Sequence, residues 1–157
     1  MLLTDWHAER GRLAVEELCA DGLDVRFVVH DAGDEAGWIE LARVAEELLG
    51  TVHALVNNAF SGTAAGFDAI TAQGLQDAMR VNATGAMTGM QVIAPLMHEG
   101  GSIVNISSMA AFYPSKGNVG YATAKMAMIS LTGSAALAYG KRKPPIRVNA
   151  IASGAIE

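Results

Sequence analysis

The stretch SSMAAFYPSKGNVGYATAK, residues 107 to 125, decides how the rest of the chain is interpreted. The apolar run SIVNIS precedes it and MAMISLTGSAALAYG follows it, which predicts a buried strand, a loop and then a helix. Tyr121 and Lys125 are four residues apart where that helix begins, so their side chains share one face. Ser108 ends the strand. Because the carboxyl ends of parallel strands line the ligand crevice of an α/β sheet, we expect the three groups to converge.

These three side chains suit proton transfer to or from an alcohol or carbonyl oxygen. A free tyrosine titrates near ~10, but a neighbouring ammonium favours the phenolate and lowers that pKa toward the working pH. Such a phenol is a useful general acid or base, and a serine hydroxyl can hydrogen-bond the same substrate oxygen. The alternative is that the Tyr-x-x-x-Lys spacing is accidental and that the serine pair is a helix cap or turn.

Four motifs occur in an order and spacing that resemble the short-chain dehydrogenase/reductase family. They are NNAF at 57 to 60, VN at 81 and 82, SIVNISS at 102 to 108 with YATAK at 121 to 125, and IRVNAIASG at 146 to 154. The resemblance implies a Rossmann-like α/β fold with a doubly wound parallel sheet. It also implies NAD(P)-dependent hydride transfer between an alcohol and a carbonyl, the hydride being carried by the nicotinamide. The catalytic set that it implies is Asn82, Ser108, Tyr121 and Lys125.

The NNAF motif is implied to lie against the cofactor. Asn57 is expected to hold the sheet together by side-chain hydrogen bonds to a neighbouring strand, while Asn58 and Ala59 approach the bound dinucleotide. Phe60 stands where the family usually has glycine. A phenylalanine adds bulk and does not adopt positive φ cheaply, so we expect altered cofactor binding there or a displaced loop.

Two acids follow predicted strands, and the resemblance places both beside the adenosine of the cofactor. Asp5 ends the strand MLLTD and is implied to bond the ribose hydroxyls and to repel a 2′-phosphate, which favours NAD over NADP. Asp31 is implied to bond the adenine amino group. The alternative is a helix N-cap for Asp5, because a helix is predicted over residues 7 to 20, and a cap or turn for Asp31.

The remaining cofactor contacts implied by the resemblance come from Tyr121, Lys125 and the IRVNAIASG motif. Gly154 keeps the glycine of a Pro-Gly pair that packs against the nicotinamide. Ser153 replaces the proline of that pair, so we expect the orientation of the ring to be less rigidly enforced.

A helix is predicted from Gly74 to about Glu99, with another over residues 121 to 140. The resemblance implies that these two helices pack against a second subunit, giving a homodimer or homotetramer, and the eight methionines of the chain suit an adaptable interface. Asn82 lies inside the first helix and is implied to link the lysine ammonium to solvent through water. The alternative is an asparagine whose side chain is satisfied locally within the helix.

In relatives, a TGxxxGxG turn precedes the strand that MLLTD resembles, and its glycines let the diphosphate approach a helix N-terminus. No such turn precedes it here. We therefore expect residues 1 to 157 to form a single partial domain, truncated at both ends and lacking the first (central) strand and the C-terminal strand. Unpaired buried amides cost about 1 to 3 kcal/mol each against a total stability of about 5 to 15 kcal/mol. Such a span should be unstable or should pair its strands directly across the gap.

Three function classes stay open. The first is the dehydrogenase or reductase, acting on a small alcohol or ketone; Phe112, Tyr113 and Pro114 would border its substrate pocket. The second is a non-catalytic interaction subunit that no longer binds dinucleotide, favoured by Phe60 and Ser153. The third is a sugar-nucleotide epimerase or dehydratase, which shares Tyr-x-x-x-Lys but fits the other motifs poorly.

Bulk composition narrows the remaining classes. A net charge of −5 with scattered basic residues argues against nucleic-acid binding. The single Cys19 excludes an intramolecular disulfide and suits a reducing cytoplasm. No apolar run reaches the ~20 residues of a membrane span, and the four histidines show no metal-ligand spacing, so neither a membrane span nor a metal site is expected.

Overall fold

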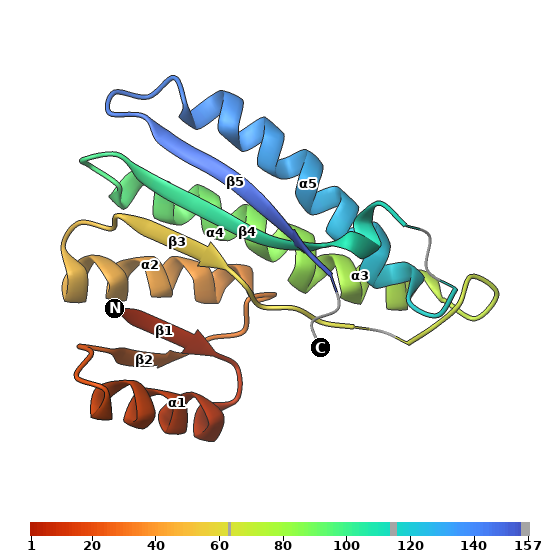
Figure 1. Cartoon of the computed structure of the whole chain (residues 1–157), viewed down its shortest axis with the longest axis horizontal. Coiled ribbons are helices and arrows are strands. Elements are labelled where there is room, and N and C mark those ends of the chain that lie inside the picture. Colours follow the sequence, from red (N-terminus) through yellow and green to blue (C-terminus); the bar gives the residue numbers. More distant parts are fainter. Residues whose placement is uncertain (63, 114–115, 155–157) are drawn as a thin grey trace.

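The computed structural model describes residues 1–62, 64–113 and 116–154, in which strands and helices alternate (Figure 1). The strands are β1 (Leu2–Asp5), β2 (Arg26–Val29), β3 (Ala54–Asn57), β4 (Gly101–Ser108) and β5 (Ile146–Ser153). The α-helices are α1 (Ala8–Ala20), α2 (Glu35–Leu49), α3 (Ala72–Met79), α4 (Ala86–Ile93) and α5 (Val119–Tyr139). The strands and helices predicted from hydrophobic periodicity are present with ends shifted by a few residues, except that the helix predicted from residue 74 to 99 is interrupted.

Every strand pair is parallel, and the strands form two sheets, β1-β2 and β3-β4-β5. In the larger sheet Asn57 lies opposite Asn105, and Ser108 lies opposite Ser153. Parallel strands joined by helices are the pattern of a Rossmann-like fold, which confirms the predicted fold class.

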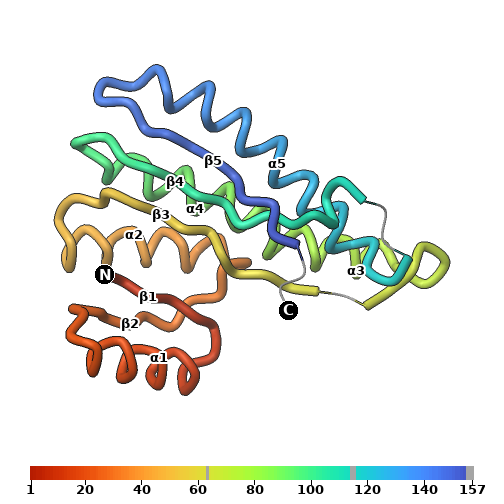
Figure 2. The backbone as a smooth tube through the Cα atoms, in the orientation of Figure 1, coloured from red at the N-terminus to blue at the C-terminus, as the bar shows by residue number. Residues whose placement is uncertain are grey.

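The two sheets do not pair with each other. Within the described residues β1 bonds only to β2 and β3 only to β4, so each sheet keeps an open edge. Direct pairing of the two halves, one of the outcomes expected for a sheet without its central strand, is therefore not what the structure shows. Figure 2 shows the chain passing from β2 into α2, which lies beside the larger sheet.

Helix ends follow simple capping chemistry. The side chain of His7 accepts from the Arg10 amide at the start of α1, and Asp34 accepts from the Ala36 amide at the start of α2. At the end of α2, Gly50 adopts a φ of 67°, a backbone conformation that glycine reaches without strain. His7 therefore takes the N-cap position that was considered for Asp5.

The helix predicted from residue 74 to 99 is interrupted. It begins at Ala72, and a π-helical segment, Arg80–Gly85, separates α3 from α4. A 3₁₀ turn, Ala94–Leu96, ends it. Single π turns inside helices occur often at functional sites, and this one contains Asn82. Periodicity alone could not show the interruption, because the apolar stripe continues through it.

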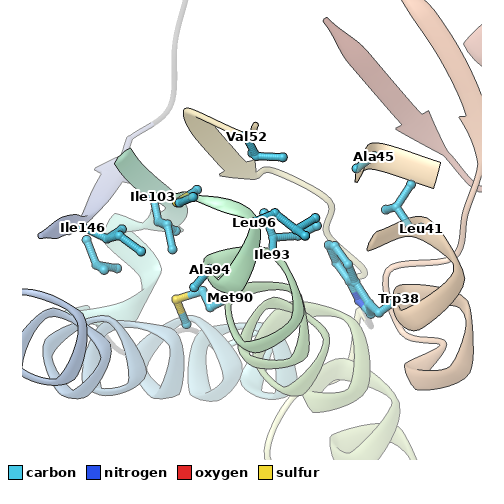
Figure 3. Close-up of a cluster of buried hydrophobic side chains, with 12 residues drawn as sticks. Trp38, Leu41, Ala45, Val52, Met90, Ile93, Ala94, Leu96, Ile103 and Ile146 are labelled. Atoms are coloured by element: carbon cyan, nitrogen blue, oxygen red, sulfur yellow. The ribbon is translucent and has the colours of Figure 1, made fainter. Parts of the chain in front are cut away.

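The main core lies between α2, α4 and the strands β4 and β5 (Figure 3). Trp38 of α2 is 5% exposed and its ring lies against Gly89 of α4, where an added Cβ would be 2.6 Å from the indole. Ile103 of β4 and Ile146 of β5 are 0% and 1% exposed. Each such side chain stabilises the fold by roughly 1.5 to 3 kcal/mol, so this core fixes the position of β4 and hence of the residues that follow it.

Candidate active site

The end of β4 brings two serines to α5. Ser107 is buried, and its hydroxyl donates to the backbone carbonyl of Lys125 at 2.9 Å, which ties the strand to the helix. Ser108 is the last residue of β4, and its hydroxyl oxygen accepts from the Ala110 amide at 3.2 Å. That bond starts a 3₁₀ turn, Met109–Ala111, which packs against α5. Ser108 therefore has the turn role that was considered for it. In this bond its hydroxyl is the acceptor, so the hydroxyl proton can still be donated to a ligand.

Tyr121 and Lys125 occupy the same region, as their spacing predicts. The Lys125 Nζ lies 5.5 Å from the centroid of the Tyr121 ring. Lys125 is 1% exposed, and its Nζ donates to the Ile106 carbonyl of β4 at 2.7 Å. Across the described residues the Tyr121 hydroxyl makes no hydrogen bond, so the phenol is available to an incoming oxygen.

Burial lowers the pKa of Lys125 to about 8. The physical cause is desolvation, which disfavours the charged ammonium. Below about pH 8 the side chain still carries the positive charge that favours a neighbouring phenolate. Above that pH the ammonium loses its charge. The pH at which this happens depends on burial, so the sequence could not indicate it.

Asn82 is fully buried in the π-helical segment, and its side chain is saturated by the protein. Its Nδ2 donates to the carbonyls of Ser61 at 2.6 Å and Ala78 at 2.8 Å, and its Oδ1 accepts from the Ser61 amide at 3.3 Å. Only the bond to Ala78 lies within the helix, so the contacts differ from the locally satisfied asparagine that was weighed as the alternative. In addition, they clamp the loop that follows β3, a role that was not predicted.

The loop after β3 is anchored at its other end by Asn57. The Asn57 Nδ2 donates to Asn105 Oδ1 at 2.8 Å, and the Asn105 Nδ2 donates to Thr132 Oγ1 at 2.9 Å. All three side chains are buried. The predicted hydrogen bond from Asn57 to a neighbouring strand is confirmed, and the network extends to α5.

Asn58, Ala59 and Phe60 follow, and all three are exposed. No non-glycine residue in the described part of the chain has a positive φ, so the loop accepts Phe60 without a left-handed backbone conformation. The Phe60 ring is 69% exposed and lies edge-on to the Tyr121 ring, with centroids 6.2 Å apart and planes at 75°. This contact joins two motifs that sequence reasoning had treated separately.

Asp5 is held by Arg10, which sequence reasoning missed. The guanidinium donates to both carboxylate oxygens at 2.9 to 3.1 Å, and the His7 amide donates to Oδ1 at 2.8 Å. Burial raises the pKa of Asp5, but the hydrogen bonds from Arg10 and His7 outweigh it, so the pKa lies below its usual value. The carboxylate is therefore ionised and stands beside a cation at the end of β1.

Asp31 is paired with Arg80 of the π-helical segment. The Arg80 Nη1 donates to Asp31 Oδ2 at 2.9 Å, and the Gly33 amide donates to Oδ1 at 2.8 Å. Burial raises the pKa of Asp31, yet the Gly33 and Arg80 hydrogen bonds lower it further, below its ordinary range. Arg80 is 49 residues away in sequence, and no local pattern marks it as a partner.

The end of β5 lies beside the end of β4. The Ser153 hydroxyl donates to the Ser107 carbonyl at 3.4 Å, and Gly154 follows it, where an added Cβ would be in ordinary contact with the Met109 side chain at 3.8 Å. Phe112 and Tyr113 are 53% and 64% exposed and line a surface hollow with Met126 of α5. Pro114, expected at the same border, lies outside the described residues.

Two kinds of site are not seen in the part of the chain that the structure describes. There, no helix combines the length and the apolar character needed to cross a membrane. In the same residues no three His, Cys, Asp or Glu side chains are grouped closely enough to hold a metal ion.

Comparisons with known proteins agree with this geometry. The NADP-dependent (R)-specific alcohol dehydrogenase of Lentilactobacillus kefiri is 33% identical over 161 residues, which cover 100% of this chain and 63% of that protein. The solved NAD⁺-bound xylitol dehydrogenase has a TM-score of 0.91 at 29% identity, covering 98% of this chain and 59% of its own. A gluconate 5-dehydrogenase from Burkholderia cenocepacia J2315, in complex with NADP and tartrate, has a TM-score of 0.90 at 25% identity and covers 99% and 61%.

The chain thus spans about three fifths of the length of these relatives. They use both NAD and NADP, so likeness to them does not choose between the two cofactors. A family model described as short chain dehydrogenase matches residues 1–157, which is the whole chain. The match from the first residue to the last, the parallel α/β fold and the shared region of Tyr121 and Lys125 together place this chain in the short-chain dehydrogenase family.

Proposed function

We propose that this chain carries the proton-transfer site of an NAD(P)-dependent enzyme that oxidises an alcohol or reduces a carbonyl, with Tyr121 as general acid/base. The observation that carries the proposal is the buried Lys125 ammonium 5.5 Å from the Tyr121 ring centroid. A positive charge at that position stabilises negative charge that develops on the phenol oxygen during the reaction, and a phenol within reach of a substrate oxygen can exchange a proton with it.

The residues divide the chemistry as follows. In alcohol oxidation the Tyr121 oxygen takes the hydroxyl proton of the substrate, and in carbonyl reduction it returns a proton to the oxygen. The Ser108 hydroxyl donates a hydrogen bond to that same oxygen and steadies the charge that develops on it. Lys125 supplies a positive charge beside the phenol below about pH 8, where its ammonium is charged. A bound nicotinamide would carry the hydride that none of these side chains can hold.

The residues at the carboxyl ends of the strands fit such a cofactor. The ionised carboxylates of Asp5 and Asp31 suit the hydroxyl and amino groups of an adenosine. Asn58, Ala59 and Gly154 are exposed and small, which permits close approach of the rest of the dinucleotide. We assign Tyr121 and Lys125 to its nicotinamide end.

We propose a preference for NAD over NADP. The carboxylate of Asp5 repels a 2′-phosphate, and Arg10, which would otherwise attract one, is already bound to both oxygens of that carboxylate. Titrating the chain with NADH and with NADPH tests the preference. An Asp5→Asn variant should bring the two dissociation constants closer together, and an unchanged ratio would contradict the assignment.

We also propose self-association through α4 and α5. A hollow on the molecular surface between these helices is lined by Met87, Gln91 and Leu131, and Leu137 of α5 is 73% exposed. Exposed apolar surface along two adjacent helices suits a second copy of the same helices. Sedimentation should show a dimer or tetramer that Leu137→Glu weakens; a monomer at all concentrations would contradict this.

The test of the main proposal is the Tyr121→Phe variant, assayed with a panel of alcohols that includes xylitol and gluconate. We expect turnover to fall by at least ~10²-fold, the contribution typical of a general acid/base, with NADH binding by fluorescence unchanged. Full activity of the variant would contradict the role of Tyr121. A parent chain that binds neither NADH nor NADPH would instead favour the non-catalytic interaction subunit.

A further inference from the structure

Phe60 makes a contact with the proposed acid/base that no matched motif accounts for. Its ring meets the Tyr121 ring at 75° with centroids 6.2 Å apart, which is the edge-to-face arrangement that aromatic pairs prefer. The rest of the ring is open, since Phe60 as a whole is 69% exposed. A large apolar side chain left this exposed is not held in place by burial, so its position depends on its backbone and on Tyr121.

The backbone beside Phe60 is fixed by Asn82. The amide and the carbonyl of Ser61, the next residue, are both hydrogen-bonded to the Asn82 side chain, at 3.3 and 2.6 Å. Asn82 in turn is fully buried and donates to the Ala78 carbonyl one turn earlier at 2.8 Å. On the other side of the loop, Asn57 is anchored in the buried network with Asn105. The loop that carries Phe60 is therefore held at both ends.

Tyr121 lies in the first turn of α5, which begins at Val119, and is partly buried. Within the described residues its ring pairs with one other aromatic ring, that of Phe60, and with one cation, the Lys125 ammonium at 5.5 Å. A phenol that must meet a substrate oxygen needs a fixed direction, because small displacements of a reacting group lower the rate steeply.

We propose that Phe60 is a positioning residue for the phenol of Tyr121, held in place by the Asn82 clamp on Ser61. The catalytic consequence rests on the proposed function, in which that phenol exchanges the proton. The contact between Phe60 and Tyr121 does not rest on the proposed function, because it is present in the folded chain without a ligand. This role would fall to the position of the NNAF motif at which this chain has phenylalanine and the family usually has glycine.

The test is fluorine NMR of the chain made with 3-fluorotyrosine, which labels its three tyrosines. Tyr121→Phe assigns the Tyr121 resonance by its disappearance. Phe60→Leu keeps an apolar side chain and removes the ring, so the Tyr121 resonance should move by more than its line width while the other two stay. Phe60→Tyr restores a ring, adds a fourth resonance, and should return the Tyr121 resonance to its original place. Phe67→Leu, at a position 82% exposed in the same connection between β3 and α3, is the matched control.

Kinetics on the same variants separate a positioning role from a structural one. We expect Phe60→Leu to lower kcat by up to about 100-fold with KM little changed, and Phe60→Tyr to recover it. A Tyr121 resonance that stays in place in Phe60→Leu, or moves equally in Phe67→Leu, would overturn the proposal, as would a moved resonance with unchanged kcat. If the Tyr121 resonance moves in Phe60→Leu but the parent chain has no turnover, the result would support the Phe60 contact and contradict the proposed function.

Discussion

The N-terminal unit β1-α1-β2 and the larger unit built on β3-β4-β5 are packed very differently. Only three of the first 31 residues are buried, Gly11, Val25 and His30. In the larger unit, β4 alternates buried residues along its length, and the core of Figure 3 joins β4 and β5 to α2 and α4. The strands also differ in length: β1 and β2 have four residues each, whereas β4 and β5 have eight each.

The difference matters for function because the proposed site is divided between the two units. The residues proposed for proton transfer, Ser108, Tyr121 and Lys125, belong to the larger, well-packed unit. The acids proposed to bind adenosine belong to the thinly packed unit: Asp5 ends β1, Asp31 follows β2 by two residues, and each is held by an arginine. Regions with few buried apolar contacts open locally at low free-energy cost, so we expect the adenosine end to be the more mobile.

The largest expected effect compares a buried residue of the larger unit with an exposed apolar residue of the N-terminal unit. Ile103→Ala in β4 removes a side chain that is 0% exposed and should lower the free energy of unfolding by about 2 to 5 kcal/mol. Val29→Ala in β2, at a position 54% exposed, should change it by less than about 0.5 kcal/mol. Urea unfolding of both variants measures the two values. Equal losses would contradict the burial of Ile103 in the core of the larger unit.

The second effect is a pH dependence confined to the larger unit. Because burial lowers the pKa of Lys125 from 10.5 to about 8, the folded chain has released this proton between those values while the unfolded chain still binds it. Stability should therefore rise with pH across that window, by about 3 kcal/mol, and lie at its lower level below pH 8. Lys125→Met should remove the rise. Lys116→Met, at an exposed lysine, should retain it, and a rise that persists in Lys125→Met would refute the assignment.

A third variant tests the buried network that anchors the loop after β3. Asn105→Leu removes the partner of both Asn57 and Thr132, and leaving buried polar groups unpaired costs about 1 to 3 kcal/mol. We expect a loss of that size in thermal or urea unfolding, with faster amide exchange in the loop from 58 to 62. Asn58→Leu, at an exposed neighbour, should cost far less. If both variants lowered the free energy of unfolding by a similar amount, the network would not be what anchors the loop.

The smallest effect concerns the ion pair that joins the two units. Arg80 and Asp31 are about half exposed, so Arg80→Gln should cost less than about 1 kcal/mol of global stability. We nevertheless expect faster amide hydrogen exchange in β2 and the turn at 31 to 34, because the turn loses its tether to the π-helical segment. Arg43→Gln removes an exposed ion pair within α2 and should leave exchange in β2 unchanged. Identical exchange in the two variants would mean that the pair does not couple the units.

Much of the fold and the centre of the site could be predicted because the signals are local. Strand and helix periods located the elements, and a four-residue spacing placed Tyr121 and Lys125 on one face. The interruption at Arg80–Gly85 could not be predicted, since the apolar stripe continues through it, and nor could the bonds of Asn82 in that segment to a loop 21 residues earlier. His7 rather than Asp5 caps α1, because the Asp5 carboxylate is engaged by Arg10.

What the sequence by itself determined is the order of parallel strands and helices, the family, and the pair of groups suited to move a proton. These follow from periodicity and from residues within one helical turn of each other. The tertiary structure alone decided the pKa of Lys125, the pairing of Asp31 with Arg80, the clamp of Asn82 on Ser61 and the contact of Phe60 with Tyr121. The physical reason is that desolvation and side-chain contacts depend on which distant segments lie together, and local sequence carries no record of that.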